Sequence, residues 1–412
     1  MTAADRLATE SGAKPAPLRL AVRRLGLSQF RCYDSVRLDL GPAPVVLSGP
    51  NGAGKTALLE ALSYLSPGQG LRRARLAEVT RLGQGEPWAV SARLDGPEGV
   101  SEIGTGLAPA ADRDDQESRA ARQVERRVER RIVRIDGKPA AGPGELAERV
   151  ALLWLTPPMD RLFQEGAPGR RRFLDRLVLG LDPRHARQAA AYEKAMRERT
   201  RLLKEPGQAD RRWLGALEER MAAAGVAVAA ARLSTLTRLE QALEAGDGPF
   251  PAALLALEGT LEGALETMPA TAVEERFRAG LADGRSRDRE AGQTLSGPHR
   301  SDLRVRHAAK GLAAGLCSTG EQKALLIAIV LANARLQAAE RGMVPLLLLD
   351  EVAAHLDAAH RAALFAALAE LGTQAWMTGT DRALFAAMPG EVQFLTVRDG
   401  RLDSVAAHAR IE

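Results

Sequence analysis

The sequence of 412 residues lacks several features that would place it in other classes of protein. It has only two cysteines, Cys32 and Cys317, which are too few and too scattered for a disulfide framework or a metal cluster. No run of 18 apolar residues is present, which argues against a transmembrane helix. The first 20 residues contain no apolar core of a secretory signal. The sequence therefore predicts a cytoplasmic protein that does not enter a membrane.

Aromatic residues are also scarce, at 4%, so the core has to consist mainly of Leu, Val, Ile and Ala. The hydrophobic content of 45% is enough for one large domain or two ordinary ones. The net charge is +5, and most of the basic residues are arginine. Arginine suits a polyanionic partner because its guanidinium group binds phosphate bidentately. The codon bias of a GC-rich genome would explain the same excess equally well.

The hydrophobic pattern divides the chain into four parts. Residues 1–16 are small and polar, which predicts a disordered tail. In residues 17–158, apolar and polar residues alternate with period two in segments on either side of a strand, a glycine turn and a helix. Helical patterns dominate residues 159–291, and strand patterns return in residues 292–412. We therefore expect an α/β fold that consists of a mixed sheet with an antiparallel β subdomain. A helical part is inserted between two halves of one nucleotide-binding domain. The charged stretch within residues 106–130 predicts a surface loop or a mobile insertion.

A phosphate-binding loop is predicted at residues 49–56, "GPNGAGKT", here called the P-loop. An apolar strand precedes it and a helix follows, which is the context that this pattern requires. Its glycines allow backbone N–H groups to surround phosphates, Lys55 would reach the β and γ phosphates, and Thr56 would ligate Mg²⁺. The predicted nucleotide-binding residues are Gly49, Pro50, Asn51, Gly52, Ala53, Gly54, Lys55 and Thr56.

Two carboxylates follow the apolar run "VPLLLL" at residues 344–349. The run predicts a strand that is buried on both faces of a parallel sheet. At its end, Asp350 would hold the Mg²⁺ shell, and Glu351 would take a proton from the attacking water. An acidic helix start favoured by the helix dipole is the alternative, but together with the P-loop the catalytic interpretation is stronger.

Residues 317–322, "CSTGEQ", here called the signature turn, open an apolar helix. Ser318 and Gly320 would lie at its N-terminus, where anions bind. Ser318 and Glu321 also fit a capping box, in which case the turn is only a well-made helix start. The turn alone does not separate these two interpretations.

The order of P-loop, anion-binding helix start and acidic strand end resembles the ATP-binding-cassette ATPases. That resemblance implies two chains arranged head to tail around two ATP molecules, with Ser318 and Gly320 of one chain on the γ-phosphate held by the other. Asp357, in "HLD", resembles the D-loop residue at that interface. In "MTGTD", Thr380 or Asp381 would replace the usual switch histidine as γ-phosphate sensor.

The chain also resembles the RecF family of bacterial recombination and repair proteins, which is related to the SMC heads. The similarity runs from about residue 18 to the end, and its segments include "FRCY" at 30–33, "GRRRFLD" at 169–175 and "SGPHRSDL" at 296–303. It implies a weak, DNA-stimulated ATPase that binds gapped or junction DNA as an ATP-induced dimer. It also implies RecR and RecO as partners that help RecA to load, and a nucleotide contact for Arg31.

Three arginines after the P-loop helix, Arg72, Arg73 and Arg75, are candidates for sequence-tolerant, salt-sensitive contacts with DNA phosphates. For Arg171 and Arg172 we expect internal ion pairs instead, for example with Asp175. Two alternative functions remain: the ATPase subunit of a membrane transporter, and a DNA clamp that binds ATP without hydrolysing it. The missing switch histidine and the large helical part argue against the first, and Glu351 argues against the second.

Overall fold

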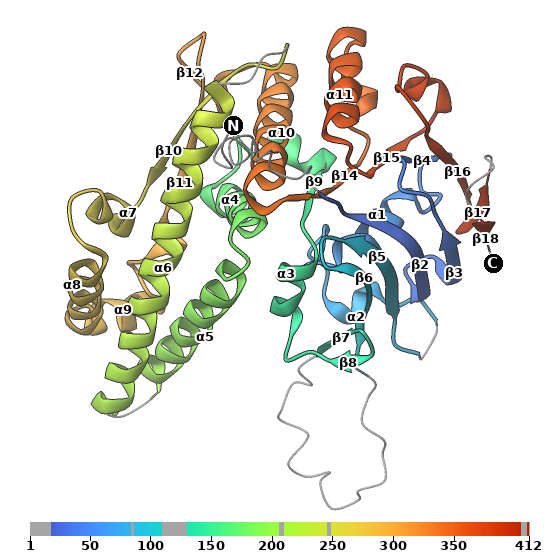
Figure 1. The fold of residues 1–412 in the computed structure, drawn as a ribbon. Coiled ribbons are helices and arrows are strands. Elements are labelled where there is room, and N and C mark those ends of the chain that lie inside the picture. The colour runs from blue at the N-terminus through green and yellow to red at the C-terminus, as the bar shows by residue number, and fades with distance from the viewer. Residues whose placement is uncertain are drawn as a thin grey trace, which may run out of the picture.

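The structure, a computed structural model, describes residues 18–83, 86–108, 130–205, 210–244, 249–404 and 410–411. The predicted N-terminal tail and most of the charged stretch at 106–130 lie outside these residues. Figure 1 shows an antiparallel sheet and helix α1 on one side of a central sheet, and a helical arm that extends from the other side.

The antiparallel sheet has the strand order β18–β3–β2–β5–β6–β7–β8. Its strands are β2 (Ala21–Phe30), β3 (Tyr33–Asp39), β5 (Ala89–Gly96), β6 (Gly99–Leu107), β7 (Arg131–Ile135), β8 (Lys138–Pro139) and β18 (Arg410–Ile411). The β7–β8 turn has positive φ at Asp136 and Gly137 (51° and 77°), as an Asp-Gly hairpin requires. The period-two alternation therefore predicted this sheet correctly.

The central sheet has the order β17–β16–β4–β15–β14–β9. Its strands are β4 (Val45–Ser48), β9 (Leu152–Leu155), β14 (Leu346–Leu349), β15 (Ala375–Gly379), β16 (Gln393–Arg398) and β17 (Arg401–Ser404). All its neighbours pair in parallel except β16 and β17. Every residue of β14 is buried, which confirms the strand predicted from "VPLLLL". The predicted fold class, a mixed sheet with an antiparallel subdomain and an inserted helical part, is confirmed.

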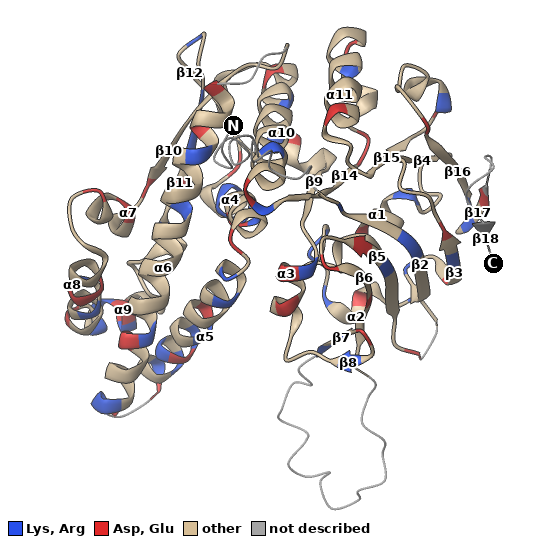
Figure 2. Ribbon diagram, viewed as in Figure 1, with Lys and Arg blue, Asp and Glu red and all other residues tan. Residues whose placement is uncertain are grey.

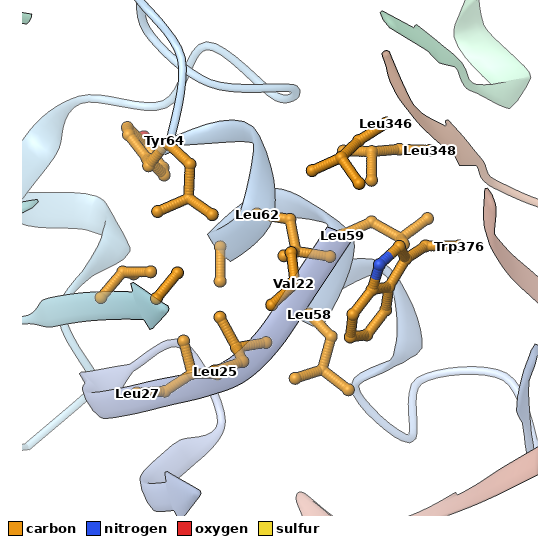
Figure 3. Packing of buried hydrophobic residues seen from close by; sticks show 14 of the residues in the cluster. Val22, Leu25, Leu27, Leu58, Leu59, Leu62, Tyr64, Leu346, Leu348 and Trp376 are labelled. Carbon is orange, nitrogen blue, oxygen red and sulfur yellow. The ribbon is translucent and has the colours of Figure 1, made fainter. Parts of the chain in front are cut away.

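Helix α1 (Lys55–Ser63) joins the two sheets through one hydrophobic core. Its leucines pack against β2 on one side and against Leu346, Leu348 and Trp376 of the central sheet on the other (Figure 3). The alternate leucines of β14, Leu347 and Leu349, face a second core. That core is closed by α4 (Ala167–Leu181), α10 (Thr319–Arg341) and α11 (Ala358–Leu371). The helix that follows the P-loop is therefore held between both sheets.

The arm consists of α5 (His185–Lys204), α6 (Arg211–Glu244), α7 (Thr260–Leu265), α8 (Ala270–Asp283) and α9 (Arg285–Ala291). A small sheet of β10 (Ala253–Glu258), β11 (Asp302–His307) and β12 (Leu312–Ala313) links the arm to the head. Helical patterns did not predict β10, which lies inside the predicted helical part. The remaining short elements are α2 (Leu76–Val79), α3 (Leu146–Arg149) and the parallel pair β1 (Leu18–Arg19) and β13 (Met343–Val344).

Candidate nucleotide-binding site

The P-loop connects β4 to α1 in a conformation that depends on glycine. Gly49, Gly52 and Gly54 have φ angles of 152°, 82° and 116°, in the region that residues with a Cβ rarely adopt. A Cβ at Gly49 would collide with the Val397 carbonyl, whereas a Cβ at Gly52 would meet open space. The Lys55 ammonium group folds over the loop and donates to the carbonyls of Gly49 (2.7 Å) and Pro50 (2.8 Å). The loop thus has the shape of a phosphate cradle.

The two predicted Mg²⁺ ligands meet across 294 residues of sequence. Thr56 Oγ1, at the start of α1, donates a hydrogen bond of 3.0 Å to Asp350 Oδ1, at the end of β14. Burial raises the pKa of Asp350, and burial also lowers the pKa of Lys55, an effect that the nearby carboxylates of Glu351 and Asp350 oppose. The fold therefore brings the P-loop lysine, the helix-start hydroxyl and both acidic residues together at one edge of the central sheet.

Thr378, which the sequence did not single out, joins this group. Its hydroxyl lies 2.8 Å from Asp350 Oδ1 and 2.8 Å from the backbone nitrogen of Glu351. Of the two residues predicted as sensors, Thr380 is exposed, and Asp381 caps the short helix η7 (Arg382–Phe385) by accepting from the Ala383 N–H; their role as sensors stays a prediction. No local pattern in the sequence singles out Thr378, because the parallel register of β14 and β15, which the fold sets, places it beside Asp350.

Arg31 lies in the β2–β3 turn with a φ of 55°. Its Nε and Nη2 atoms bond to the Glu60 carboxylate at 2.9 and 2.6 Å, and its Nη1 atom bonds to the Glu78 carbonyl at 2.6 Å. Glu60 is fully buried on α1, so this bidentate ion pair fixes the turn to the P-loop helix. The nucleotide contact expected for Arg31 stays a prediction.

The signature turn forms the capping box that its sequence suggested. Ser318 Oγ accepts from the Glu321 N–H (3.4 Å), and Glu321 Oε2 accepts from the Ser318 N–H (2.9 Å). Lys310, from the turn between β11 and β12, forms an ion pair with Glu321. The hydrogen bonds that Ser318 makes within the described part of the chain stay inside its own turn. Asp357 caps α11 in the same manner by accepting from the His360 N–H (2.9 Å).

The candidate DNA-binding arginines are exposed but point to different neighbours. Arg72 lies 3.9 Å from the Glu60 carboxylate, and Arg73 is close enough to Arg172 to lower its pKa, after the larger effect of burial. Arg75 precedes α2 with 85% of its side chain exposed. Figure 2 shows basic and acidic segments interspersed over the arm helices rather than segregated by sign.

No direct ion pair of Arg171 or Arg172 with Asp175 is present among the described residues, although the carboxylates of Asp302 and Asp175 lie near enough to Arg171 to oppose the lowering of its pKa by burial. Asp175 instead bonds to Arg232 at 2.8 Å and to His185 at 2.9 Å. Arg171 donates to the Ser301 carbonyl at 2.7 Å, next to the "GPHR" segment. The competing arginine comes from the middle of α6, a position that the spacing within α4 could not reveal.

The stacked sheets, the glycine cradle and the acidic end of β14 define a P-loop ATPase head of the SMC type. A family model described as "RecF/RecN/SMC N terminal domain" matches residues 21–401. A relative from Mesorhizobium japonicum is 52% identical over 386 residues, 93% of this chain and 98% of its own length. One from Brucella abortus is 50% identical over 392 residues, 94% of this chain and 97% of its own. Both are named "DNA replication and repair protein RecF".

The chain therefore belongs to the RecF family, within the RecF/RecN/SMC group. Among solved structures, the recombination mediator protein RecF with ATPrS superposes with a TM-score of 0.78 at 21% identity, over 95% of this chain and all of that one. An Smc head domain from Pyrococcus furiosus gives 0.52 at 15% identity, over 94% of this chain and 96% of that one. These structural similarities show that the chain has the fold of RecF and of the Smc head domains. The named relatives do not favour the transporter alternative, and within the described residues no helix is long and apolar enough to cross a membrane.

Proposed function

We propose that the chain is an ATP-dependent DNA-binding protein of recombinational repair and replication-fork recovery. Its curated relatives carry the name of a DNA replication and repair protein. The observation that carries the catalytic part is the Thr56–Asp350 hydrogen bond, because it joins the phosphate cradle to the acidic strand end in the arrangement that Mg²⁺–nucleotide chemistry requires.

The residues of the site fit ATP and Mg²⁺. The open space at Gly52 and the left-handed glycines leave room for phosphates against the backbone of the P-loop. The oxygens of Thr56 and Asp350, 3.0 Å apart, would hold Mg²⁺, which neutralises phosphate charge when bound. Lys55 would bind the β and γ phosphates, and Glu351 would accept the proton of the attacking water. For Asp381, a contact with the nucleotide is supported only by the resemblance to the ATP-binding-cassette ATPases.

We infer that a second copy of the chain completes the site. The signature turn caps its own helix, and Leu316 beside it is 76% exposed, so this end of α10 has an apolar residue available for a partner. In a head-to-tail dimer, Ser318 and Gly320 would meet the γ-phosphate held by the partner's P-loop, with Asp357 at the same interface. ATP binding would close this dimer, and hydrolysis would open it.

We propose DNA with gaps or single-strand to double-strand junctions as the ligand of the closed dimer. Arg72, Arg73 and Arg75 would contact phosphates, so binding would be sequence-tolerant and weaken with salt. RecR, RecO and RecA are the partners that the family resemblance implies, and a solved fold relative is itself described as part of a RecFOR pathway. Hydrolysis would be weak and stimulated by DNA.

The variant Glu351→Gln tests whether hydrolysis drives release. It keeps the size of the side chain but removes the base, so we expect ATP turnover to fall by on the order of a hundredfold or more. The ATP-bound dimer should then persist on gapped DNA, as measured by dissociation from an immobilised duplex. Glu340→Gln, at the exposed far end of α10, is the control and should behave as wild type. If Glu351→Gln hydrolysed ATP at the wild-type rate, Glu351 would not be the catalytic base.

A further inference from the structure

Thr378 and Asp350 lie side by side at the ends of two neighbouring parallel strands. The register pairs Leu349 of β14 with Met377 of β15, so the next residue of each strand reaches the same edge of the sheet. Thr378 is 1% exposed, and its hydroxyl lies at 2.8 Å from both Asp350 Oδ1 and the Glu351 nitrogen. One buried oxygen therefore contacts both acidic residues of the site.

The direction of these hydrogen bonds follows from the chemistry of the groups. An ionised carboxylate only accepts and a backbone amide only donates, so the Thr378 hydroxyl donates its single hydrogen to Asp350 and accepts from the Glu351 N–H. Asp350 Oδ1 also accepts from Thr56. Thr378 thus fixes the side chain of Asp350 and the backbone of Glu351 at once.

The backbone of Glu351 needs such support. Its φ of 54° lies in the left-handed region, which is unfavourable for a residue with a Cβ. This angle decides the direction in which the Glu351 carboxylate leaves the chain. The hydrogen bond from the Glu351 N–H to Thr378 ties that unusual conformation to the rigid end of β15.

We propose that Thr378 is a positioning residue for ATP hydrolysis, which orients Glu351 toward the attacking water while it shares Asp350 with Thr56. This inference rests on the proposed ATPase function. Within "MTGTD" (residues 377–381), it assigns the link to the site to Thr378 instead of Thr380 or Asp381. Thr380 is exposed, and the Asp381 carboxylate is engaged at the start of η7.

The test compares Thr378→Val, which keeps the shape but removes the hydroxyl, with Thr378→Ser, which keeps the hydroxyl. We expect Thr378→Val to lower kcat for ATP by on the order of 10- to 100-fold with little change in KM, because a misplaced base slows the chemical step without weakening substrate binding. Thr378→Ser should retain most of the rate. As a second readout, which does not measure ATP turnover directly, the ATP-bound dimer of Thr378→Val should persist on gapped DNA, as for Glu351→Gln.

Thr373→Val is the matched control. Thr373 precedes the same strand, is 2% exposed, and donates one hydrogen bond of 2.6 Å to the Pro345 carbonyl. Thr373→Val loses one buried hydrogen bond and Thr378→Val loses two, so both should lower Tm, but only Thr378→Val should lower kcat. Should Thr378→Val fail to fold, Thr378→Ala, which adds no apolar methyl beside the carboxylate, provides the same comparison.

Three results would overturn the inference. Equal kcat in Thr378→Val and Thr373→Val would show that the hydroxyl is only structural. A raised KM with unchanged kcat would make Thr378 a binding residue. A rate in Thr378→Ser as low as that of Thr378→Val would exclude a role for the hydroxyl. Absence of hydrolysis by the wild-type chain would contradict the proposed function itself, and the inference with it, whereas an active wild type with an equally active Thr378→Val would contradict only the inference.

Discussion

At the scale of single residues, charge at the signature turn is the feature that most affects the proposed dimer. Glu321 places a carboxylate on the Ser318 N–H, at the helix end that would receive the partner's γ-phosphate. The Lys310 side chain and the bonds to Ser318 hold the pKa of Glu321 at about 2, so the carboxylate is charged at neutral pH. The approaching phosphate would therefore meet both a negative group and the lysine that compensates it.

Glu321→Gln should consequently strengthen the ATP-induced dimer. Glutamine can still accept from the Ser318 N–H, but it carries no charge and releases Lys310 from its ion pair. We expect the dissociation constant of the dimer in ATP to fall roughly two- to fivefold, the size expected for exposed charge interactions. Sedimentation velocity measures it, with Glu340→Gln as the control at the other end of α10. A weaker dimer would mean that the charge of Glu321 assists contact between the chains.

At the scale of elements, buried ion pairs hold the arm together. Arg199 on α5 is fully buried and bonds to Glu218 of α6 (3.0 Å), to Asp288 of α9 (2.6 Å) and to the Leu281 carbonyl of α8 (2.6 Å). It also contacts Thr294, shortly before the "GPHR" segment. A single guanidinium group thus joins four parts of the arm, and its loss would leave buried carboxylates without this partner.

Arg199→Met should loosen the arm without disturbing the head. Breaking a buried pair by removal of one partner costs about 3–5 kcal/mol, and local stability is read by amide hydrogen exchange. We expect faster exchange in α5, α6 and α9 but unchanged exchange in α1. Arg197→Met, which removes an exposed pair with Glu193 on the same helix, should cost less than about 1 kcal/mol. Unchanged exchange in the arm of Arg199→Met would show that packing alone stabilises it.

The sequence predicted those elements whose pattern repeats locally and those sites whose residues are contiguous. The alternation in β2 and β5, the all-apolar β14 and the P-loop followed from neighbouring residues alone. It did not predict β10, whose strand conformation depends on pairing with β11 about fifty residues later. It also missed Thr378 and the Arg232–Asp175 pair, because strand register and helix packing bring those residues together.

At the scale of the whole molecule, the central claim is that each nucleotide site is shared by two chains. Lys55 and Thr56 lie at the start of α1, whereas the hydrogen bonds of Ser318 in the described residues stay within the signature turn. If the P-loop of one copy works with the signature turn of another, defects in the two motifs must complement each other. Defects in motifs that work within one chain cannot do so.

Mixing Lys55→Ala chains with Ser318→Arg chains tests this claim most directly. Each variant alone should hydrolyse almost no ATP, because every site in its dimer is damaged. In the mixture, a hybrid dimer contains one site with an intact P-loop and an intact signature turn, so turnover should return to on the order of a quarter of the wild-type rate. A mixture as inactive as its components, with hybrid dimers demonstrated by cross-linking, would contradict the shared site.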